Sequence, residues 1–315
     1  MRCLCCDKEM VNPTEYEVES QWHSKCIKKF FDTAALPDLD ISHDEIEKIA
    51  NEAVNKKLTV PGVQKKLSLH LSKDDGKQRL TIVDYPTDYI LKPQSQEYEA
   101  LPEAEFLVMK MAEVAKIKTV PNALIMKNGE FSYITKRVDR IKNGMLAMED
   151  FCQLSGRVTA DKYKSSYENC GKVVKSFSKN TGLDMADIYY RILFSFATGN
   201  SDMHLKNFSL IEDKPGSRIY GLSPAYDLLP VNVIVPADKE QMALTINGKK
   251  RNIRKKDFIA LASSMGLADK TALGFMKRIA GLEKTYLQMI EDSYLPENMK
   301  KAFMELAMER IAVFE

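Results

Sequence analysis

The stretch SFATGNSDMHLKNFSL, residues 195–210, carries more polar chemistry than a connecting loop needs. An apolar helical pattern precedes its polar centre and an apolar stretch follows it, so the polar residues lie between two structured elements. Within six residues it supplies an acid, a base, a cation and an amide: Asp202, His204, Lys206 and Asn207. This combination predicts a functional site at the end of a helix.

The bulk composition describes an ordinary soluble globular protein. The chain has 315 residues, 44% of them hydrophobic and 29% charged, which is enough to bury one large or two medium cores. A net charge of +2 argues against a protein that coats nucleic acid. No run of about 18 apolar residues is present, so no membrane contact is expected. The first residues lack an apolar signal region, and a cytoplasmic location is expected.

The hydrophobic pattern changes character near residue 145. Before it we expect strands at 67–71, 80–85 and 88–93, a hairpin around Asn128-Gly129, and helices at 44–56 and 97–117. After it, two short strands interrupt predicted helices at 168–180, 184–199, 256–264, 268–283 and 296–314. The sequence therefore predicts a two-lobed α+β fold, with a strand-rich N-lobe (31–138) and a helical C-lobe (139–315) after a small N-terminal segment (1–30).

Four of the six cysteines lie in that N-terminal segment. Cys3-x-x-Cys6 and His23-x-x-Cys26 are two chelating pairs, separated by a 16-residue loop. Thiolate and imidazole ligands suit tetrahedral Zn²⁺, and four protein ligands leave no open position, so the pattern favours a structural zinc knuckle. Cys5 is a spare thiol with poorer spacing. The alternative is a cluster of free cysteines near a chain terminus.

The spacing of three polar residues is typical of kinase-type phosphoryl transfer. Asn207 follows Asp202 by five positions, and Asp227 comes 20 residues later, after the two short strands. In such sites one Asp accepts the proton of the substrate hydroxyl, while the Asn and the second Asp hold magnesium. Oxygen ligands of this kind are the ones that Mg²⁺ requires.

The upstream half of such a site needs a lysine on a strand and a glutamate on a helix. Lys92 in "DYILKP" is the candidate lysine, and Glu105 is its expected partner, with Glu103 as second choice. A glycine-rich G-x-G-x-x-G loop is missing; "TVPGVQKKL" offers a single glycine, Gly62, whose neighbouring amides suffice only for a small anion nest.

Seven ordered motifs resemble the HipA family of toxin serine/threonine kinases. They are TVPGVQKKLSL, YILKP, LPEAEF, ITKRVDR, DFCQLSG, GNSDMHLKNFSL and SPAYDLLP, within residues 57–315. The resemblance implies a protein kinase fold that uses ATP and Mg²⁺, and a toxin restrained by an antitoxin. Known members phosphorylate aminoacyl-tRNA synthetases.

The resemblance also implies residue roles. Asp202 would be the catalytic base, Asn207 and Asp227 the magnesium ligands, and Lys92 the contact to the ATP phosphates. His204 would brace the catalytic loop.

Further roles follow from the same motifs. Lys206 would neutralise charge on the γ-phosphate. Lys136 and Val138 would lie at the hinge that reads adenine. The phosphate loop would consist of Gly62, Val63 and Gln64. Family members autophosphorylate on a hydroxyl just before that loop, and the matching position is Thr59, a threonine where serine is common.

Partners are implied by the resemblance alone. A HipB-like antitoxin is expected, with DNA reached only through it. About 58 residues precede the phosphate loop, where longer members have a β-rich segment. The chain therefore resembles the short, HipT-like branch, in which that segment can be a separate small protein.

Two other functions compete with this one. A non-catalytic pseudokinase would bind ATP and recruit partners without transferring phosphate. A small-molecule kinase is the third hypothesis, because an Asp-x-His-x-x-Asn loop also resembles that of lipid kinases; the lack of a basic membrane-facing helix argues against it.

Overall fold

The computed structural model describes residues 1–39, 66–72, 78–83, 87–142 and 144–315. The chain divides into two compact units. The first comprises residues 1–106 and 120–140, and the second comprises 107–119 and 141–315. The helix predicted at 44–56 lies outside the described residues.

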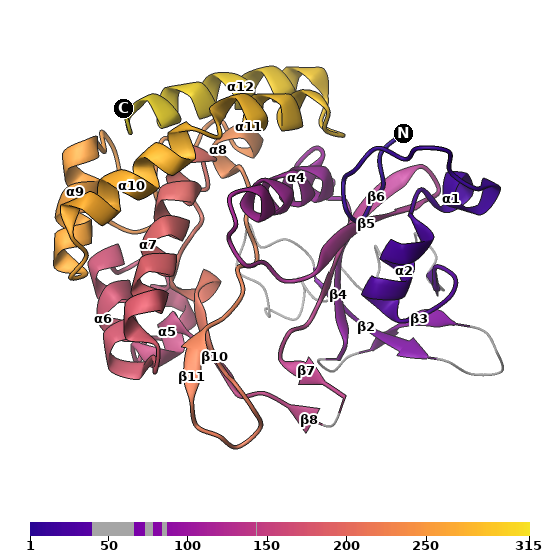
Figure 1. Ribbon diagram of the computed structural model, residues 1–315, viewed down its shortest axis with the longest axis horizontal. Helices are drawn as coiled ribbons and strands as arrows, with labels where there is room; N and C mark the ends of the chain where they lie inside the picture. Colours follow the sequence, from indigo (N-terminus) through magenta and orange to yellow (C-terminus); the bar gives the residue numbers. More distant parts are fainter. Residues whose placement is uncertain (40–65, 73–77, 84–86, 143) are drawn as a thin grey trace. The chain divides into compact units, whose positions relative to one another are not determined.

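A six-stranded sheet forms the body of the first unit (Figure 1), in the order β1-β3-β2-β4-β6-β5. All neighbouring strands are antiparallel except β1 and β3. The strands are β1 (Asp38–Leu39), β2 (Leu67–Ser72), β3 (Arg79–Val83), β4 (Tyr89–Lys92), β5 (Asn122–Lys127) and β6 (Glu130–Lys136).

The predicted hairpin joins β5 to β6. Asn128 and Gly129 both have positive φ, +53° and +82°, the backbone that a tight two-residue turn between antiparallel strands requires. Glycine adopts it without steric cost, and asparagine tolerates it better than most residues. The hairpin prediction is confirmed.

Two short helices begin the first unit, α1 (Glu15–Ser20) and α2 (Ser24–Phe31). Helix α1 starts with a capping box, in which the Thr14 side chain accepts from the backbone of Glu17 and the Glu17 side chain accepts from the Thr14 backbone. Helix α2 is amphipathic and buries one face, which carries Cys26, Ile27, Phe30 and Phe31.

Helix α4 (Leu101–Val114) connects the two halves of the chain. Residues up to Phe106 belong to the first unit, and the helix from Leu107 onward belongs to the second. Nearly all its side chains are buried, including the polar Glu105 and Lys110. It lies inside the helix predicted at 97–117.

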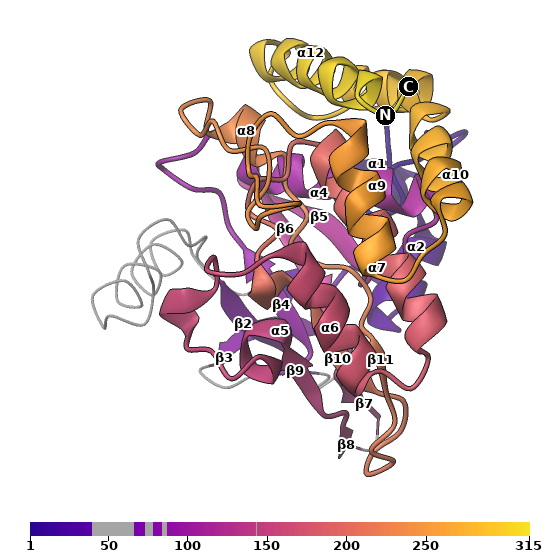
Figure 2. The ribbon, with the colours of Figure 1, turned by 90° about the vertical axis from the view of Figure 1, so that its left-hand side faces the viewer.

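Helices dominate the second unit, around the buried helix α7 (Thr181–Ala197). Helix α7 contacts α6, α10, α12 and strand β11 (Figure 2). The other helices are α5 (Phe151–Leu154), α6 (Tyr167–Phe177), α8 (Val231–Ile234), α9 (Lys255–Ser264), α10 (Asp269–Ala280), α11 (Glu283–Glu291) and α12 (Glu297–Ala312), with short 3₁₀ turns η1 (Thr159–Asp161) and η2 (Leu205–Asn207).

A small sheet in the order β11-β10-β9 accompanies these helices. Its strands are β9 (Met148–Asp150), β10 (Ser209–Glu212) and β11 (Tyr220–Leu222). A separate two-stranded pair joins β7 (Arg140–Ile141) and β8 (Gly144–Met145). Among the described helices, none combines the length and the hydropathy that crossing a membrane requires.

Candidate active site

A buried ion pair in the first unit joins the end of β4 to the first part of α4. Nζ of Lys92 lies 2.5 Å from Oε1 of Glu105, and the two side chains are 2% and 0% exposed. The Lys92 ammonium also lies 5.2 Å from the centroid of the Tyr133 ring, on the neighbouring strand β6. Removing two charges from water is costly, so a pair this deeply buried is poor evidence for added stability and better evidence for a function.

Of the two glutamates considered as partners of Lys92, the structure places Glu105 against it. Glu103 is on the same helix, and burial raises the pKa of its carboxyl to about 7.

Of the two predicted hinge residues, Lys136 ends strand β6 and Val138 follows the strand. The backbone N–H of Lys136 donates to the carbonyl of Pro121, at 3.0 Å, and the Lys136 ammonium lies 6.0 Å from the centroid of the Tyr89 ring. Val138 lies in the turn between β6 and β7.

In the second unit, the polar loop after α7 folds back on itself. The Asn207 side-chain amide donates to the backbone carbonyl of Asp202, at 2.9 Å. The backbone N–H of Asp202 donates to the side-chain oxygen of Asn200, at 3.2 Å. These bonds, with the 3₁₀ turn η2, place Asp202 and Asn207 side by side despite their separation in sequence.

Within this loop the side chain of His204 is buried, only 6% exposed. Nε2 of His204 is 3.9 Å from Oδ2 of Asp202. Burial lowers the pKa of His204 to about 4, against the opposing effects of the Asp202 and Asp227 carboxylates. The imidazole is therefore neutral at pH 7 and supports the loop by packing.

Sequence reasoning missed Tyr163 as a neighbour of Asp202. Its phenol donates a hydrogen bond to Oδ1 of Asp202. Its ring contacts His204 edge to face, with centroids 4.9 Å apart. Tyr163 follows the turn η1, nearly forty residues before the loop, and no spacing pattern in the sequence links the two.

Lys206 forms an ion pair with Asp150 at the end of β9. Nζ of Lys206 lies 2.6 Å from Oδ2 of Asp150. Asp150 also caps helix α5, where its side chain accepts from the backbone of Gln153. The structure thus gives the Lys206 ammonium a carboxylate partner within its own unit.

Asp227 follows β11 in an uncommon backbone conformation. Its φ is +54°, which costs a non-glycine residue free energy and is concentrated at functional sites. The segment just before it is held firmly: the backbone N–H of Ala225 donates to the carbonyl of Lys118, at 2.7 Å, and the Arg191 guanidinium donates to the carbonyl of Ser223, at 2.8 Å. The carboxylates of Asp227 and Asp202 both act on the pKa of His204, so one region of the second unit holds all three residues.

The structure brings the four predicted zinc ligands together, whereas the predicted phosphate loop is outside the described residues. Cys3, Cys6, His23 and Cys26 come together in the first unit, with their ligand atoms all within 4.8 Å of one another. The proposed phosphate loop Gly62, Val63 and Gln64, together with Thr59, lies outside the described residues.

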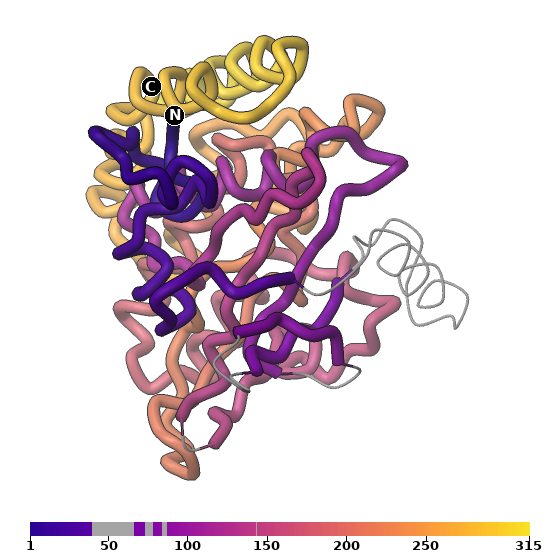
Figure 3. Tube along the Cα trace, turned by 90° about the vertical axis from the view of Figure 1, so that its right-hand side faces the viewer, coloured from indigo at the N-terminus to yellow at the C-terminus, as the bar shows by residue number. Residues whose placement is uncertain are grey.

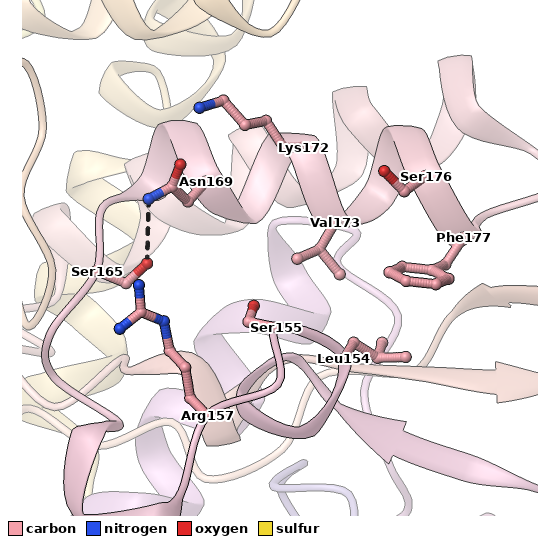
Figure 4. Close-up of a pocket in the computed structure, with 9 residues that line it drawn as sticks. All are labelled: Leu154, Ser155, Arg157, Ser165, Asn169, Lys172, Val173, Ser176 and Phe177. Atoms are coloured by element: carbon pink, nitrogen blue, oxygen red, sulfur yellow. Dashed lines mark hydrogen bonds between the residues drawn. The ribbon is translucent and has the colours of Figure 1, made fainter.

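A surface groove in the second unit lies between α6 and the segment around α5 (Figure 4). Arg157 and Lys172 contribute cationic side chains, and the Asn169 amide donates to Oγ of Ser165 at 3.5 Å. None of the predicted site residues lines this groove.

Comparison with known proteins gives a match that spans both units. The model of the family described as HipA-like C-terminal domain matches residues 58–286. Y4dM of Sinorhizobium fredii, provisionally named a kinase, is 32% identical over 69% of this chain and 56% of its own length. The serine/threonine-protein kinase toxin HipA of Shewanella oneidensis is 25% identical over 71% of this chain and 55% of its own length. The chain spans about half the length of the curated relatives it matches.

Two solved structures share this fold. HipA of Shewanella oneidensis, solved in a complex with HipB and operator DNA, superposes with a TM-score of 0.68 at 19% identity, covering 84% of this chain and 70% of that one. The proinflammatory kinase CtkA of Helicobacter pylori gives a TM-score of 0.54 at 14% identity, covering 79% of this chain and 93% of that one. The predicted α+β, kinase-like fold is confirmed.

Proposed function

Because this chain belongs to the HipA-like C-terminal domain family, we propose that it is a protein kinase that transfers the γ-phosphate of ATP to a serine or threonine hydroxyl. The observation that carries the proposal is the ion pair between Lys92 and Glu105, which is buried almost completely. Protein kinases require such a pair between a strand lysine and a helix glutamate to hold the ATP phosphates. The polar loop of the second unit supplies the residue types that the rest of the reaction needs.

Each residue has a role that its environment supports. Lys92 binds the nucleotide phosphates, and Glu105 fixes the direction of its ammonium. Asp202 orients the substrate hydroxyl and accepts its proton. Catalysis then rests on positioning and on charge stabilisation, as is usual for phosphoryl transfer.

Asn207 and Asp227 are the proposed ligands of Mg²⁺, which neutralises charge on the phosphates when bound. The chemistry of this donor set fits a magnesium ion, because both side chains offer hard oxygen atoms. The Asn207 amide nitrogen donates to the Asp202 backbone, which leaves Oδ1 as the atom that it presents to a cation.

Four roles complete the proposal. His204 braces the loop as a buried neutral imidazole. The Lys206 ammonium leaves its ion pair with Asp150 and then pairs with the γ-phosphate. The backbone near Lys136 and Val138 reads adenine, and Gly62, Val63 and Gln64 cradle phosphates through backbone amides.

The biological role that we propose is that of a toxin in a toxin–antitoxin system. The solved HipA structure with this fold is a complex with HipB and operator DNA, which supports a HipB-like antitoxin as partner and an indirect link to DNA. We further propose a translation protein such as an aminoacyl-tRNA synthetase as substrate, autophosphorylation at Thr59, and a separate small N-subdomain protein as a second partner.

Mass spectrometry of the purified protein tests the central claim. Intact and peptide masses are measured before and after incubation with ATP and Mg²⁺, for the wild type, Asp202→Ala and Asp227→Ala. Asp213→Ala, which removes an exposed carboxylate beside strand β10, is the matched control. We expect phosphate on Thr59 in the wild type and in the control, and none in the two site variants. Transfer that persists in both site variants would contradict the proposal.

A non-catalytic ATP-binding role is the second candidate. The hydrogen bond from Tyr163 to Asp202 favours it, because the phenol occupies one oxygen of the proposed base. ATP binding without phosphate on the protein, or on added synthetases, would support this candidate over the kinase.

A further inference from the structure

We propose that Cys3, Cys6, His23 and Cys26 bind a structural Zn²⁺ ion that fastens the N-terminal segment to the sheet carrying Lys92. This site is separate from phosphoryl transfer and goes beyond the proposed kinase function. The four ligand atoms all lie within 4.8 Å of one another. Sγ of Cys6 is 3.4 Å, and Sγ of Cys26 4.0 Å, from Nδ1 of His23. Ligand atoms of a tetrahedral zinc site are roughly 3.5–3.8 Å apart, so the side chains need only small adjustments.

Backbone hydrogen bonds build this site from two directions. The N–H of Cys3 donates to the carbonyl of Lys8, and the N–H of Asp7 donates to the carbonyl of Cys3, both at 2.9 Å. These two bonds close a tight turn that brings Cys3 and Cys6 to the same side. The N–H of His23 donates to Sγ of Cys3 at 3.3 Å, an arrangement that suits a thiolate. The N–H of Leu4 donates to the carbonyl of Gln21 and joins the two ligand pairs.

The position of Cys26 adds to the case for metal. Cys26 lies in the first turn of α2, so a metal held by the four ligand atoms would tie the start of this helix to the turn that carries Cys3 and Cys6. Cys3 and Cys26 are buried, and all six cysteines of the chain are free thiols in this structure. Cys5 lies outside the four-residue group, which makes it a natural control.

Residues next to the ligands hold strand β5. The Leu4 carbonyl accepts from the backbone N–H of Leu124, at 2.8 Å, and the indole N–H of Trp22 donates to the Leu124 carbonyl, at 3.2 Å. Both backbone groups of Leu124 are thereby satisfied by the N-terminal segment, drawn in indigo in Figure 3. Trp22 is fully buried, so the attachment is also a part of the core. Leu4 follows Cys3 and Trp22 precedes His23, which ties each contact to a ligand.

Helix α2 extends the attachment to the lysine strand. The rings of Phe30 and Phe31 pack on Tyr89, with centroids 5.9 and 5.4 Å apart, and the Tyr89 hydroxyl donates to the Phe30 carbonyl at 3.4 Å. Tyr89 begins β4, and Lys92 ends it. A metal that fixes the start of α2 therefore also holds the packing partner of β4. Losing it would loosen the strand that presents Lys92.

Metal content, cobalt spectroscopy and thermal unfolding test this site without relying on kinase activity. The full chain is purified without chelator, and zinc per chain is measured by inductively coupled plasma mass spectrometry. Cys26→Ser removes one ligand, Cys5→Ser is the matched control, and His23→Cys replaces one zinc ligand with another. The wild-type chain is also stripped of metal and titrated with Co²⁺, whose visible absorption reports a tetrahedral thiolate site.

We expect one zinc per chain in the wild type, Cys5→Ser and His23→Cys, and a tetrahedral Co²⁺ spectrum after exchange. Chelation or Cys26→Ser should lower the melting temperature of the strand-rich unit by about 10 °C or more. If Cys26→Ser does not fold, the zinc content and the Co²⁺ spectrum of the wild type decide whether the chain has a tetrahedral zinc site. No zinc and no tetrahedral Co²⁺ spectrum in the wild type would overturn the proposal, as would a disulfide within the cluster under reducing conditions. Zinc retained by a folded Cys26→Ser would overturn this ligand set.

An ATP-binding measurement then tests the link to Lys92, and only this part rests on the proposed function. We expect the metal-free chain to bind ATP at least tenfold more weakly than the zinc-loaded chain. If the chain binds zinc but its ATP affinity does not change when the zinc is removed, the link to Lys92 is overturned and the proposal of the metal site stands. Zinc in a chain that binds no ATP in either state would instead contradict the proposed kinase function.

Discussion

The phenol of Tyr163 donates a hydrogen bond to Oδ1 of Asp202, the carboxylate to which we assign the proton of the substrate hydroxyl. The Tyr163 ring packs against His204, which keeps the phenol in place. A serine or threonine hydroxyl that approaches the same oxygen must first displace the phenol. Tyr163 is thus a built-in competitor for the proposed base.

We predict that Tyr163→Phe raises kcat/KM for the protein substrate about 3- to 10-fold. A hydrogen bond to a charged group contributes about 1.5–3 kcal/mol, and water screens part of that for a side chain as accessible as this one. Phenylalanine keeps the ring against His204, so the variant isolates the hydroxyl. Steady-state kinetics with ATP and a substrate peptide measure the effect. A fall in kcat/KM would instead make Tyr163 a positioning residue for Asp202.

Variants of Lys92 and Glu105 can separate the effect of this ion pair on ATP binding from its effect on stability. We predict that Lys92→Met weakens ATP binding at least 100-fold and lowers the free energy of unfolding by about 3–5 kcal/mol, because it removes the cation that lies 2.5 Å from a buried carboxylate. Adding Glu105→Gln removes that charge and should recover most of the stability but none of the ATP affinity. Calorimetric titration and urea unfolding provide the two readouts. ATP affinity restored in the double variant would refute the assigned role of Lys92.

The strand-rich unit was predictable because its signals are local. Strand β4 was expected at 88–93 and spans Tyr89–Lys92, and the turn at Asn128-Gly129 followed from the backbone that only a few residue types adopt. Several of the shorter helices were missed, among them α1 and α11, whose signals are weaker. Helix α1 buries none of its residues, and α11 buries only Tyr286 and Ile290, so neither has a broad apolar stripe.

Contacts between distant parts of the chain were harder to predict. Lys92 and its partner glutamate lie close in sequence, and their pairing followed from one strand and one helix. Tyr163 contacts Asp202 through a loop without periodicity, which leaves nothing in the sequence to indicate it. Asp150 was within reach of sequence reasoning, since it begins the motif DFCQLSG, but its ion pair with Lys206 depends on how β9 pairs with β10.

The buried His204 predicts a loss of stability in acid. Its pKa is about 4 in the folded chain and about 6.5 when unfolded, so below pH 6.5 the unfolded state takes up the proton first. The free energy of unfolding should therefore fall as the pH drops from about 6.5 to 4, by about 3 kcal/mol from this group. Asp202 and Asp227 oppose this effect, and Lys162 adds to it.

Replacing His204 by glutamine should flatten the pH dependence of stability over that range. His70→Gln is the control, because that ring is about half exposed, in the other unit. Urea unfolding at several pH values between 4 and 7 gives the slopes. Equal slopes for the wild type and His204→Gln would show that the imidazole is accessible to protons in the folded chain.

Gly199 links the end of α7 to the Asp202 loop, and the structure predicts that alanine is poorly tolerated there. The φ of Gly199 is +68°, and a Cβ atom would lie 2.7 Å from Cδ2 of Leu306, on α12. The backbone cost is about 1–2 kcal/mol, and displacing Leu306 adds to it. Gly266→Ala is the matched control, because its φ is +74° but its Cβ would meet no atom within 4 Å. We expect Gly199→Ala to destabilise the protein by about 2 kcal/mol more than the control, as measured by urea unfolding. Leu306→Ala should recover part of this difference.

Phosphoryl transfer should fall in Gly199→Ala even under conditions where the variant is fully folded, because Gly199 begins the loop that carries Asp202. Full activity in a folded Gly199→Ala would show that the loop keeps its geometry independently of this helix end.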